Sequence, residues 1–439
     1  MMNKVYIETY GCQMNFADTE IVESILLKNE YEVVNEVEQA DFILINTCAI
    51  RDNAEQRIRK RVRELRALQN RRMLKIGVLG CMAERLKTQL LEEEDNVSFV
   101  VGPDAYRKIV DILKDVEQGA KIAETELSET ETYADIEPVR LNGNGISAYI
   151  SIMRGCQNFC AYCVVPYTRG HERSRDPQTI VEEARILFER GYKEVTLLGQ
   201  NVNSYKWKNA SSAVGFAELM EKVALISPKL RVRFATSHPK DLSDELLKVM
   251  AKYDNICKCI HLPVQSGSDR MLKLMNRHYT AEWYLNRIAA IKQYLPDCSI
   301  TTDVIAGFCT ETEEDHQATL EMFRKVHYDY AYMFKFSLRP NTYAAKYLHD
   351  DIPEDVKTRR LEEIIALQGE IALENNRMEI GKEFEILVEG TSHRSKEQLF
   401  GRNSQNKVIV FNRGNATIGE YAKVKVTDCT SATLIGELV

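Results

Sequence analysis

The chain has 439 residues, of which 44% are hydrophobic and 28% charged, and its formal net charge at pH 7 is −7. This length predicts two or three domains, and the negative charge excludes a protein that binds RNA through its overall charge rather than through local basic patches. The eleven cysteines do not suggest a disulfide framework. We see neither a signal-peptide pattern nor an apolar stretch of membrane-spanning length, so we expect a cytoplasmic monomer without membrane contact.

Three apolar runs in the first hundred residues each end at a cysteine and lead into a helical pattern. The runs end at Cys12, Cys48 and Cys81, which are 36 and 33 residues apart. Near-continuous apolar runs are typical of parallel strands covered on both faces, so residues 1–125 are predicted to form a Rossmann-like parallel-sheet domain. Equivalent strand ends of such a sheet lie along one edge. We therefore expect these three thiols to converge.

A set of three converging thiols points to a metal site. Each cysteine alone would be interpreted as a small buried hydrophobic residue, but three at equivalent strand ends favour a ligand role. Zinc with a fourth ligand is one candidate. A [4Fe-4S] cluster held by three cysteines, with one iron left open, suits the set better.

The segment 51–75 concentrates positive charge directly after Cys48, with ten basic and three acidic residues. Most charge runs are solvated helix faces, yet this one could also follow RNA phosphates, and the sequence leaves both interpretations open. The basic residues are Arg51, Arg57, Arg59, Lys60, Arg61, Arg63, Arg66, Arg71, Arg72 and Lys75.

An acidic linker is predicted at 126–146. Its acids include Glu126, Glu129, Glu131, Asp135 and Glu137, and it ends in the turn residues Asn142-Gly143-Asn144-Gly145. A domain boundary near residue 146 follows.

Cys156, Cys160 and Cys163 form a C-x3-C-x2-C triplet directly after the next predicted strand. Three thiolates so close together can hold one face of a [4Fe-4S] cluster and leave one iron open. A zinc knuckle is the alternative, but no second cysteine pair follows at the usual distance. The triplet resembles the signature of the radical S-adenosylmethionine (SAM) superfamily, in which SAM binds the open iron and is cleaved to a 5′-deoxyadenosyl radical.

Strands and helices alternate between residues 147 and 375, which predicts a partial (β/α)6 barrel. The expected strands are 148–153, 194–198, 232–236, 259–264, 299–305 and 331–336. The triplet lies at the carboxyl rim, where barrel enzymes carry their chemistry. Small or polar residues at the other strand ends are candidates for binding SAM, namely Gly199, Gln200, Ser237, Gln265 and Asp303.

Several other reactive side chains of this domain lack a ligand pattern. His238 and His261 are open to either an acid–base or a structural role. The cysteines without ligand spacing, which we predict to be non-ligands, are Cys257, Cys259, Cys298, Cys309 and Cys429.

Residues 376–439 contain five short strand patterns and are predicted to form a small antiparallel β-barrel of a kind that binds RNA. Basic residues between 391 and 413 are interleaved with Phe400 and Phe411, which fits contact with single-stranded RNA. A structural barrel with solvated charges is the alternative. The basic residues are His393, Arg394, Lys396, Arg402, Lys407 and Arg413.

The whole chain resembles the methylthiotransferases, which join a domain with three cluster cysteines to a radical SAM domain and a C-terminal TRAM domain. Asn46-Thr47-Cys48 and Gly80-Cys81 match that family. The motif Thr9-Tyr10-Gly11-Cys12-Gln13-Met14-Asn15 is similar to the MiaB-type branch, which acts on N(6)-dimethylallyladenosine in tRNA. One departure is Cys309-Thr310, where the family usually has Pro-Gly.

The resemblance implies conversion of the adenine C2–H bond to C2–SCH3 beside the tRNA anticodon. The implied cofactors are two [4Fe-4S] clusters, one at each cysteine set, together with SAM. One SAM would methylate sulfur held at the N-terminal cluster, and another would yield the radical that abstracts the C2 hydrogen. The implied partners are the anticodon stem-loop of tRNA, a reducing electron donor protein and a sulfur donor.

Two rival functions stay open on the sequence. Related enzymes perform the same chemistry on threonylcarbamoyl-adenosine or on a ribosomal-protein aspartate, and they usually differ at the residues corresponding to Gln13 and Met14. The other rival is a non-catalytic protein that binds zinc and RNA.

Overall fold

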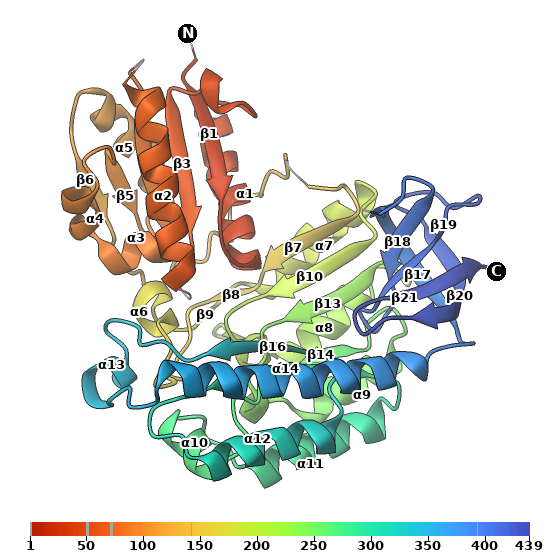
Figure 1. Ribbon diagram of the computed structural model, residues 1–439. Coiled ribbons are helices and arrows are strands. Elements are labelled where there is room, and N and C mark those ends of the chain that lie inside the picture. Colours follow the sequence, from red (N-terminus) through yellow and green to blue (C-terminus); the bar gives the residue numbers. More distant parts are fainter. Residues whose placement is uncertain (1, 50–51, 71–72, 142, 393) are drawn as a thin grey trace.

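The computed structural model describes residues 2–49, 52–70, 73–141, 143–392 and 394–439 and contains the three domain types expected from the sequence (Figure 1). An N-terminal parallel-sheet domain and a small C-terminal barrel lie at opposite ends of a central, open barrel. None of the helices in the described ranges combines the length and apolarity needed to cross a membrane.

The N-terminal domain is built on a six-stranded parallel sheet that helices cover on both faces. Its strands are β1 (Lys4–Thr9), β2 (Glu32–Val33), β3 (Phe42–Thr47), β4 (Lys75–Gly80), β5 (Phe99–Val101) and β6 (Ile122–Glu124), in the order β2-β1-β3-β4-β5-β6. The helices are α1 (Gln13–Lys28), α2 (Asp52–Gln69), α3 (Cys81–Leu86), α4 (Thr88–Glu93) and α5 (Ile109–Glu117). Helices α1 and α5 pack on one face and α2, α3 and α4 on the other. Because β1, β3 and β4 are neighbours, their carboxyl ends share one edge.

The central domain has six barrel strands in two parallel three-stranded sheets. The strands are β7 (Ser147–Ser151), β10 (Glu194–Leu198), β13 (Arg231–Ala235), β14 (Cys259–His261), β15 (Ser299–Ala306) and β16 (Tyr330–Lys335). An isolated parallel bridge between Val232 and Ile256 connects the two halves. The outer helices are α7 (Pro177–Glu189), α8 (Phe216–Ala224), α9 (Asp244–Lys252), α11 (Ala281–Tyr294), α12 (Glu313–Val326) and α14 (Glu354–Arg377). The predicted partial barrel is therefore confirmed.

Smaller elements decorate the carboxyl rim of this barrel. They are β8 (Met153–Arg154) paired with β9 (Arg173–Ser174), the hairpin of β11 (Lys206–Lys208) and β12 (Ala213–Gly215), and the helices α6 (Val165–Arg169), α10 (Asp269–Leu274) and α13 (Tyr343–Tyr347). Helix α6 lies between the N-terminal domain and the barrel (Figure 1), where it contacts α3.

The acidic segment after β6 is packed against both domains. The Tyr133 side chain is 1% exposed, and its hydroxyl donates to the Pro103 carbonyl at 3.0 Å and accepts from the Tyr106 amide at 3.1 Å. The Arg154 guanidinium of the barrel lies 4.6 Å from the centre of the Tyr133 ring. The segment thus contacts both domains through Tyr133.

Five strands close the C-terminal barrel in the order β17-β18-β19-β21-β20. Their bounds are β17 (Glu383–Thr391), β18 (Gln398–Arg402), β19 (Val408–Asn412), β20 (Tyr421–Cys429) and β21 (Leu434–Leu438). The predicted barrel is confirmed, with β19 and β21 as a parallel pair. A closed ring with an odd number of strands cannot alternate direction at every pair, so one parallel pair is required.

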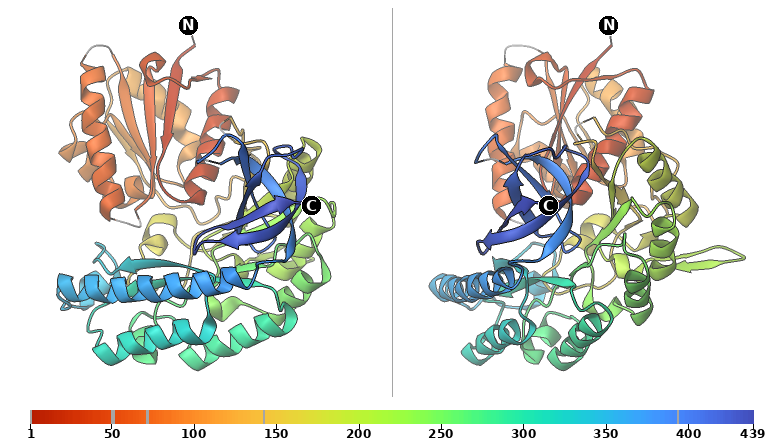
Figure 2. Two further views of the ribbon diagram at one scale, coloured as in Figure 1. Left: turned by 45° about the vertical axis from the view of Figure 1, so that its right-hand side comes forward. Right: turned by 90° about the vertical axis from the view of Figure 1, so that its right-hand side faces the viewer.

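Part of the basic character of this barrel serves to attach it to the central domain. Buried Glu194 accepts from Arg233 at 2.7 Å and from Arg402 at 3.0 Å. Lys407 pairs with Asp329 of the central domain at 2.8 Å. Figure 2 shows the C-terminal barrel seated against the end of the central domain. Arg402 and Lys407 therefore act as structural residues.

Phe411 corrects another expectation for RNA contact. Its side chain is 1% exposed and belongs to the core of the C-terminal barrel, so it cannot stack on a base. Phe400 is half-buried. His393 lies outside the described residues.

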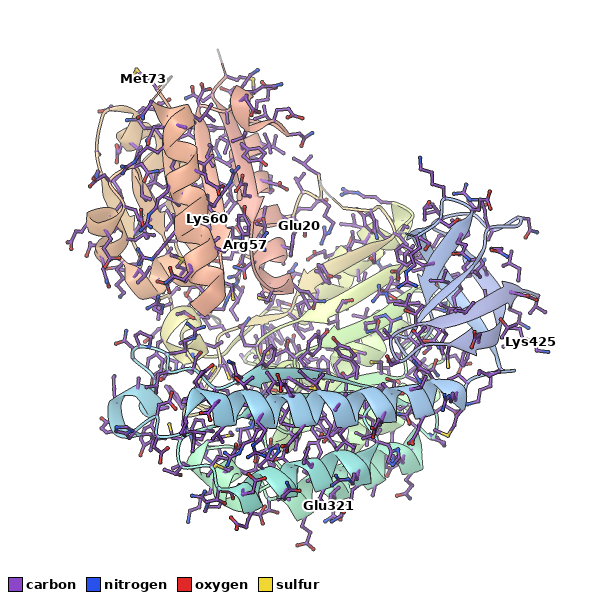
Figure 3. The ribbon with its side chains drawn as sticks, viewed as in Figure 1. Glu20, Arg57, Lys60, Met73, Glu321 and Lys425 are labelled. Atoms are coloured by element: carbon purple, nitrogen blue, oxygen red, sulfur yellow. The ribbon has the colours of Figure 1, made fainter. Side chains whose placement is uncertain are left out.

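Most basic side chains of α2 are paired with acids of their own domain. Arg57 and Lys60 are exposed on this helix (Figure 3). The paired groups are Arg59 with Glu93, Arg61 with Glu8 and Arg63 with Glu94, at 2.7, 2.5 and 2.7 Å. Three other basic residues of the segment, Arg51, Arg71 and Arg72, fall outside the described residues.

Glu23 of α1 should make the stability of the protein depend on pH. Its side chain is 2% exposed, and burial, with the nearby charge of Glu20, raises its pKa to about 8. Between the unfolded value of about 4.3 and this pKa, the folded chain holds a proton that the unfolded chain has lost, so stability falls as pH rises.

We expect Glu23→Gln to raise the free energy of unfolding at pH 8 by on the order of 2 kcal/mol and to flatten its fall between pH 5 and 8. Urea midpoints across this range measure the effect. Glu182→Gln, a change at a largely exposed side chain of α7, is the control. Parallel pH curves for both variants and the unmodified protein would contradict the assignment.

Candidate active site

The three N-terminal cysteines lie together at the carboxyl edge of the parallel sheet. Cys12 is the N-cap of α1, Cys48 follows β3, and Cys81 is the first residue of α3. The thiols of Cys12 and Cys48 are hydrogen-bonded, which lowers the pKa of Cys12 to about 6. Burial raises the pKa of Cys81, while the Arg169 guanidinium opposes that rise. The structure thus brings together the side chains that the strand pattern predicted to converge.

Two glycines allow these loops to approach each other. Gly11 has a φ of +142°, and a Cβ at this position would lie 2.7 Å from Cys48 Cβ. Gly80 has a φ of +90°, and its Cβ would lie 2.6 Å from the Thr47 carbonyl oxygen. Any side chain at either position would push the cysteine loops apart.

Buried asparagines hold the loops in this arrangement. Asn15 donates to Asn46 Oδ1 at 3.2 Å and to the Thr47 carbonyl at 3.0 Å, and it accepts from the Cys12 amide at 3.3 Å. Asn46 in turn donates to the Asn15 carbonyl at 2.9 Å. Sequence reasoning quoted both residues only as motif members. The available signal was their position close to cysteines and, for Asn46, in a run that is otherwise apolar.

The second thiol set is the triplet, which lies in the loop after β8. Cys156 and Cys160 are buried and Cys163 is half-buried. The loop is fixed by a bond from the Cys163 amide to the Cys160 carbonyl at 2.9 Å and by one from the Cys156 amide to the Gly170 carbonyl at 3.1 Å. Burial raises the pKa of Cys156 to about 11 and that of Cys163 to about 12. These thiols need a compensating positive charge to ionise.

Arg277 supplies positive charge at the triplet and was missed on the sequence. Its side chain is 4% exposed and donates to Cys160 Sγ and to the Tyr162 hydroxyl, both at 3.3 Å. It also donates to the Pro263 carbonyl at 2.9 Å. No local pattern marks a lone arginine more than a hundred residues away, so only the fold reveals it.

Four of the candidate SAM residues, Gly199, Gln200, Ser237 and Gln265, follow the strands β10, β13 and β14, whereas Asp303 lies within β15. Ser237 donates to Asn203 Oδ1 at 3.3 Å, and Asp303 Oδ1 lies 3.4 Å from His261 Nε2. Gly199 packs against Met153, since a Cβ there would lie 2.4 Å from Met153 Cγ. Three polar atoms of this rim are buried without a hydrogen-bond partner in the described part of the chain. They are Gln200 Oε1, Gln265 Oε1 and Asn203 Nδ2. These unpaired groups suit a polar ligand.

The two histidines have different surroundings. His238 accepts from the Lys240 amide at 3.3 Å and caps a short helical turn, and burial lowers its pKa to about 2. The ring therefore stays neutral near pH 7, and its Nε2 is buried without a hydrogen-bond partner among the described residues. His261 Nδ1 is hydrogen-bonded to Thr301 Oγ1 at 2.9 Å, and its Nε2 lies 3.4 Å from Asp303 Oδ1.

Cys309 and Thr310 differ in their surroundings, and the cluster that contains Cys309 also includes Ala161 of the triplet loop. Cys309 is fully buried in a cluster with Phe308 and Phe336. Thr310 adopts a φ of +61°, the left-handed region that a glycine enters at low cost. Its amide donates to Asp351 at 2.7 Å and its carbonyl accepts from Arg270 at 2.5 Å, which holds this conformation.

Both thiol sets have the chemistry of [4Fe-4S] sites. Each offers three thiols, the side chains that hold such clusters. Arg169 donates to Cys81 Sγ at 3.2 Å, as Arg277 does to Cys160. Buried guanidinium groups beside the thiols offset the negative charge of thiolates and metal clusters. The residues present therefore fit the groups that the sequence implies.

Comparison with known proteins agrees with this architecture. Three family models match the chain: "Uncharacterized protein family UPF0004" over residues 4–102, "Radical SAM superfamily" over 150–323 and "TRAM domain" over 377–439. Among solved structures, the radical SAM methyltransferase TsrM from Kitasatospora setae gives a TM-score of 0.59 at 13% identity, covering 79% of this chain and 77% of that one. The cobalamin-dependent radical SAM enzyme OxsB gives 0.55 at 13% identity, covering 83% and 56%. These two establish the fold.

Curated relatives match along almost the full length. A protein of Phocaeicola vulgatus named tRNA-2-methylthio-N(6)-dimethylallyladenosine synthase is 56% identical over 438 residues, which are 99% of this chain and 96% of the relative. A protein of the same name from Chloroherpeton thalassium is 56% identical over 435 residues, covering 99% and 95%. The chain therefore belongs to the tRNA-2-methylthio-N(6)-dimethylallyladenosine synthase family of radical SAM methylthiotransferases.

Proposed function

We propose that this chain converts N(6)-dimethylallyladenosine next to the tRNA anticodon to its 2-methylthio derivative. The observation that carries the proposal is the presence of two separate three-thiol sites, one on the N-terminal sheet edge and one on the barrel rim, connected by the short helix α6. Full-length identity to enzymes of that name supports it. Relatives acting on threonylcarbamoyl-adenosine or on a protein aspartate are the competing assignments.

We assign one [4Fe-4S] cluster to Cys156, Cys160 and Cys163 and a second to the N-terminal cysteines. When bound, the first cluster with SAM supplies the radical that removes the adenine C2 hydrogen, and the second holds the sulfur to be transferred. The chain positions both sites: Arg277 and Arg169 donate to cysteine sulfurs, and the asparagine network fixes the N-terminal loops.

The polar rim is the proposed binding site for SAM. Gln200, Ser237 and Gln265 follow the strands β10, β13 and β14, and Asp303 lies within the next strand, β15. Their side-chain oxygens can accept from the amine and ribose hydroxyls of SAM. Gly199 lets the rim backbone pack closely on Met153.

RNA contacts are proposed for the exposed basic side chains of the C-terminal barrel and of α2. On the barrel these are Arg394, Lys396 and Arg413, and on α2 they are Arg57 and Lys60. The target adenosine must be turned out of the anticodon loop to reach the rim. The reaction also consumes electrons and a sulfur atom, so we infer that a reducing electron donor protein and a sulfur donor are partners. We propose that the protein acts as a monomer in the cytoplasm.

The deciding experiment offers the reconstituted enzyme three tRNA anticodon stem-loops, which carry adenosine, N(6)-dimethylallyladenosine or threonylcarbamoyl-adenosine, and separately the ribosomal protein. We expect a methylthio product, detected by mass spectrometry, from the dimethylallyl substrate. Product from the threonylcarbamoyl RNA or the protein instead would replace the substrate assignment. Zinc in place of iron would remove the enzyme assignment.

Iron content should report the two thiol sites separately. The anaerobically reconstituted protein is expected to hold about eight iron and eight sulfide per chain. Cys48→Ala and Cys160→Ala should each hold about four, because each loses one of three ligands at one site. Cys257→Ala, at a buried cysteine outside both sets, should keep about eight. A value of four for the unmodified protein would exclude a second cluster.

The same two variants should separate SAM cleavage from methylthiolation. We expect Cys160→Ala to abolish formation of 5′-deoxyadenosine, because SAM loses its cluster. In Cys48→Ala, 5′-deoxyadenosine formation should persist while methylthiolated RNA disappears. Chromatographic quantification of both products gives the answer. Full methylthiolation by Cys48→Ala would rule out the N-terminal site as the source of the sulfur group.

A further inference from the structure

Arg169 belongs to the barrel but reaches into the N-terminal thiol site. It is the last residue of α6, a five-residue helix that starts two residues after Cys163. Its side chain is 3% exposed. The guanidinium donates through Nε to Cys81 Sγ at 3.2 Å and through Nη2 to Asp18 Oδ2 at 2.7 Å. One short helix therefore spans from a cysteine of the triplet to a contact with a cysteine of the other site.

A second arginine beside the triplet converges on the same carboxylate. Arg154, two residues before Cys156, is 1% exposed and donates through Nη2 to Asp18 Oδ1 at 2.5 Å. Asp18 itself is fully buried. The two guanidinium groups thus share one carboxylate, so Asp18 balances only one of their two positive charges beside the N-terminal thiols.

The Arg169 guanidinium has an unused donor. Arg169 Nη1 is buried and has no hydrogen-bond partner among the described residues. A buried guanidinium is costly unless its charge and its donors are matched. A cluster on the neighbouring thiolates would supply both a negative charge and sulfur acceptors. A purely structural ion pair would have no need of the contact to Cys81.

The protein contains such a structural pair close by. Arg173, on β9, crosses the same domain boundary and donates to Asp104 Oδ1 at 2.9 Å and to the Glu131 carbonyl at 3.0 Å. No cysteine is among the partners found for it in the described chain. Arg173 therefore provides a matched comparison for Arg169, with the same residue type and the same boundary.

We propose that Arg169 is a positioning residue that couples the two thiol sites. It donates to sulfur at the N-terminal site and, through α6, fixes that site relative to the triplet. This inference rests on the proposed function. It has two measurable consequences, because the charge stabilises the reduced, more negative state of an iron–sulfur centre and because the tether aligns two groups that must react together.

The first test isolates the N-terminal site. In a chain carrying Cys156→Ala, Cys160→Ala and Cys163→Ala, iron can bind only at Cys12, Cys48 and Cys81. The reduction potential is measured by EPR-monitored titration after adding Arg169→Gln, Arg169→Lys or Arg173→Gln. We expect a lower potential with Arg169→Gln, a value near the starting one with Arg169→Lys, and no change with Arg173→Gln. Equal potentials for Arg169→Gln and Arg173→Gln would overturn the charge contact.

The second test uses the chain with all six cysteines. Arg169→Lys keeps the positive charge, but an ammonium group lacks the planar guanidinium that donates to Asp18 and Cys81 at the same time. We expect 5′-deoxyadenosine formation within about twofold of the unmodified enzyme and methylthiolation reduced about tenfold or more. Unchanged methylthiolation would overturn the tether, and this variant decides the question even if Arg169→Gln fails to fold.

The two hypotheses fail in different ways. An unmodified enzyme that makes no methylthio product would refute the proposed function, whereas the potentials of the isolated site would still decide whether Arg169 contacts it. An enzyme that makes the product while its Arg169 variants behave like Arg173→Gln would leave the function intact and refute only the coupling.

Discussion

The arrangement of the active site depends on one buried carboxylate, Asp18, shared by two arginines of another domain. Removing Asp18 would leave both guanidinium groups buried without a counter-charge, at a cost of about 3–5 kcal/mol for a broken buried pair. Its partners Arg154 and Arg169 flank the triplet in sequence. The interaction therefore joins the N-terminal domain to the barrel rim close to both thiol sites.

Elsewhere the structure uses charge to assemble domains more than to attract RNA. Glu194 binds arginines from the barrel and from the C-terminal domain, and α2 neutralises most of its own positive charge within the N-terminal domain. Charged side chains that form these ion pairs are fixed and partly buried, so they do not contribute to a phosphate-binding surface. The exposed remainder, with a net negative chain, implies RNA binding through a few local contacts.

Local sequence patterns predicted the strands and the barrel correctly, because burial on a sheet depends on residues close together in the chain. Apolar runs predicted the strands that carry Cys12, Cys48 and Cys81, and β/α alternation predicted the partial barrel, because both patterns reflect burial on a sheet. They were unreliable for charged and aromatic side chains on the C-terminal barrel. Arg402 is used in an interdomain ion pair and Phe411 lies in the core. Composition cannot tell which face of a strand meets another domain.

Cysteine spacing and hydrophobic periodicity are local properties of the chain, so the two sets of candidate ligands and the fold type could be predicted from the residues alone. The sequence also indicated the family through short motifs around those cysteines. The distant groups that surround the thiols became visible in the folded structure alone. Arg277 reaches Cys160 from more than a hundred residues away, and Arg169 reaches Cys81 across a domain boundary. Contacts of this kind arise from packing of whole elements, which no local pattern encodes.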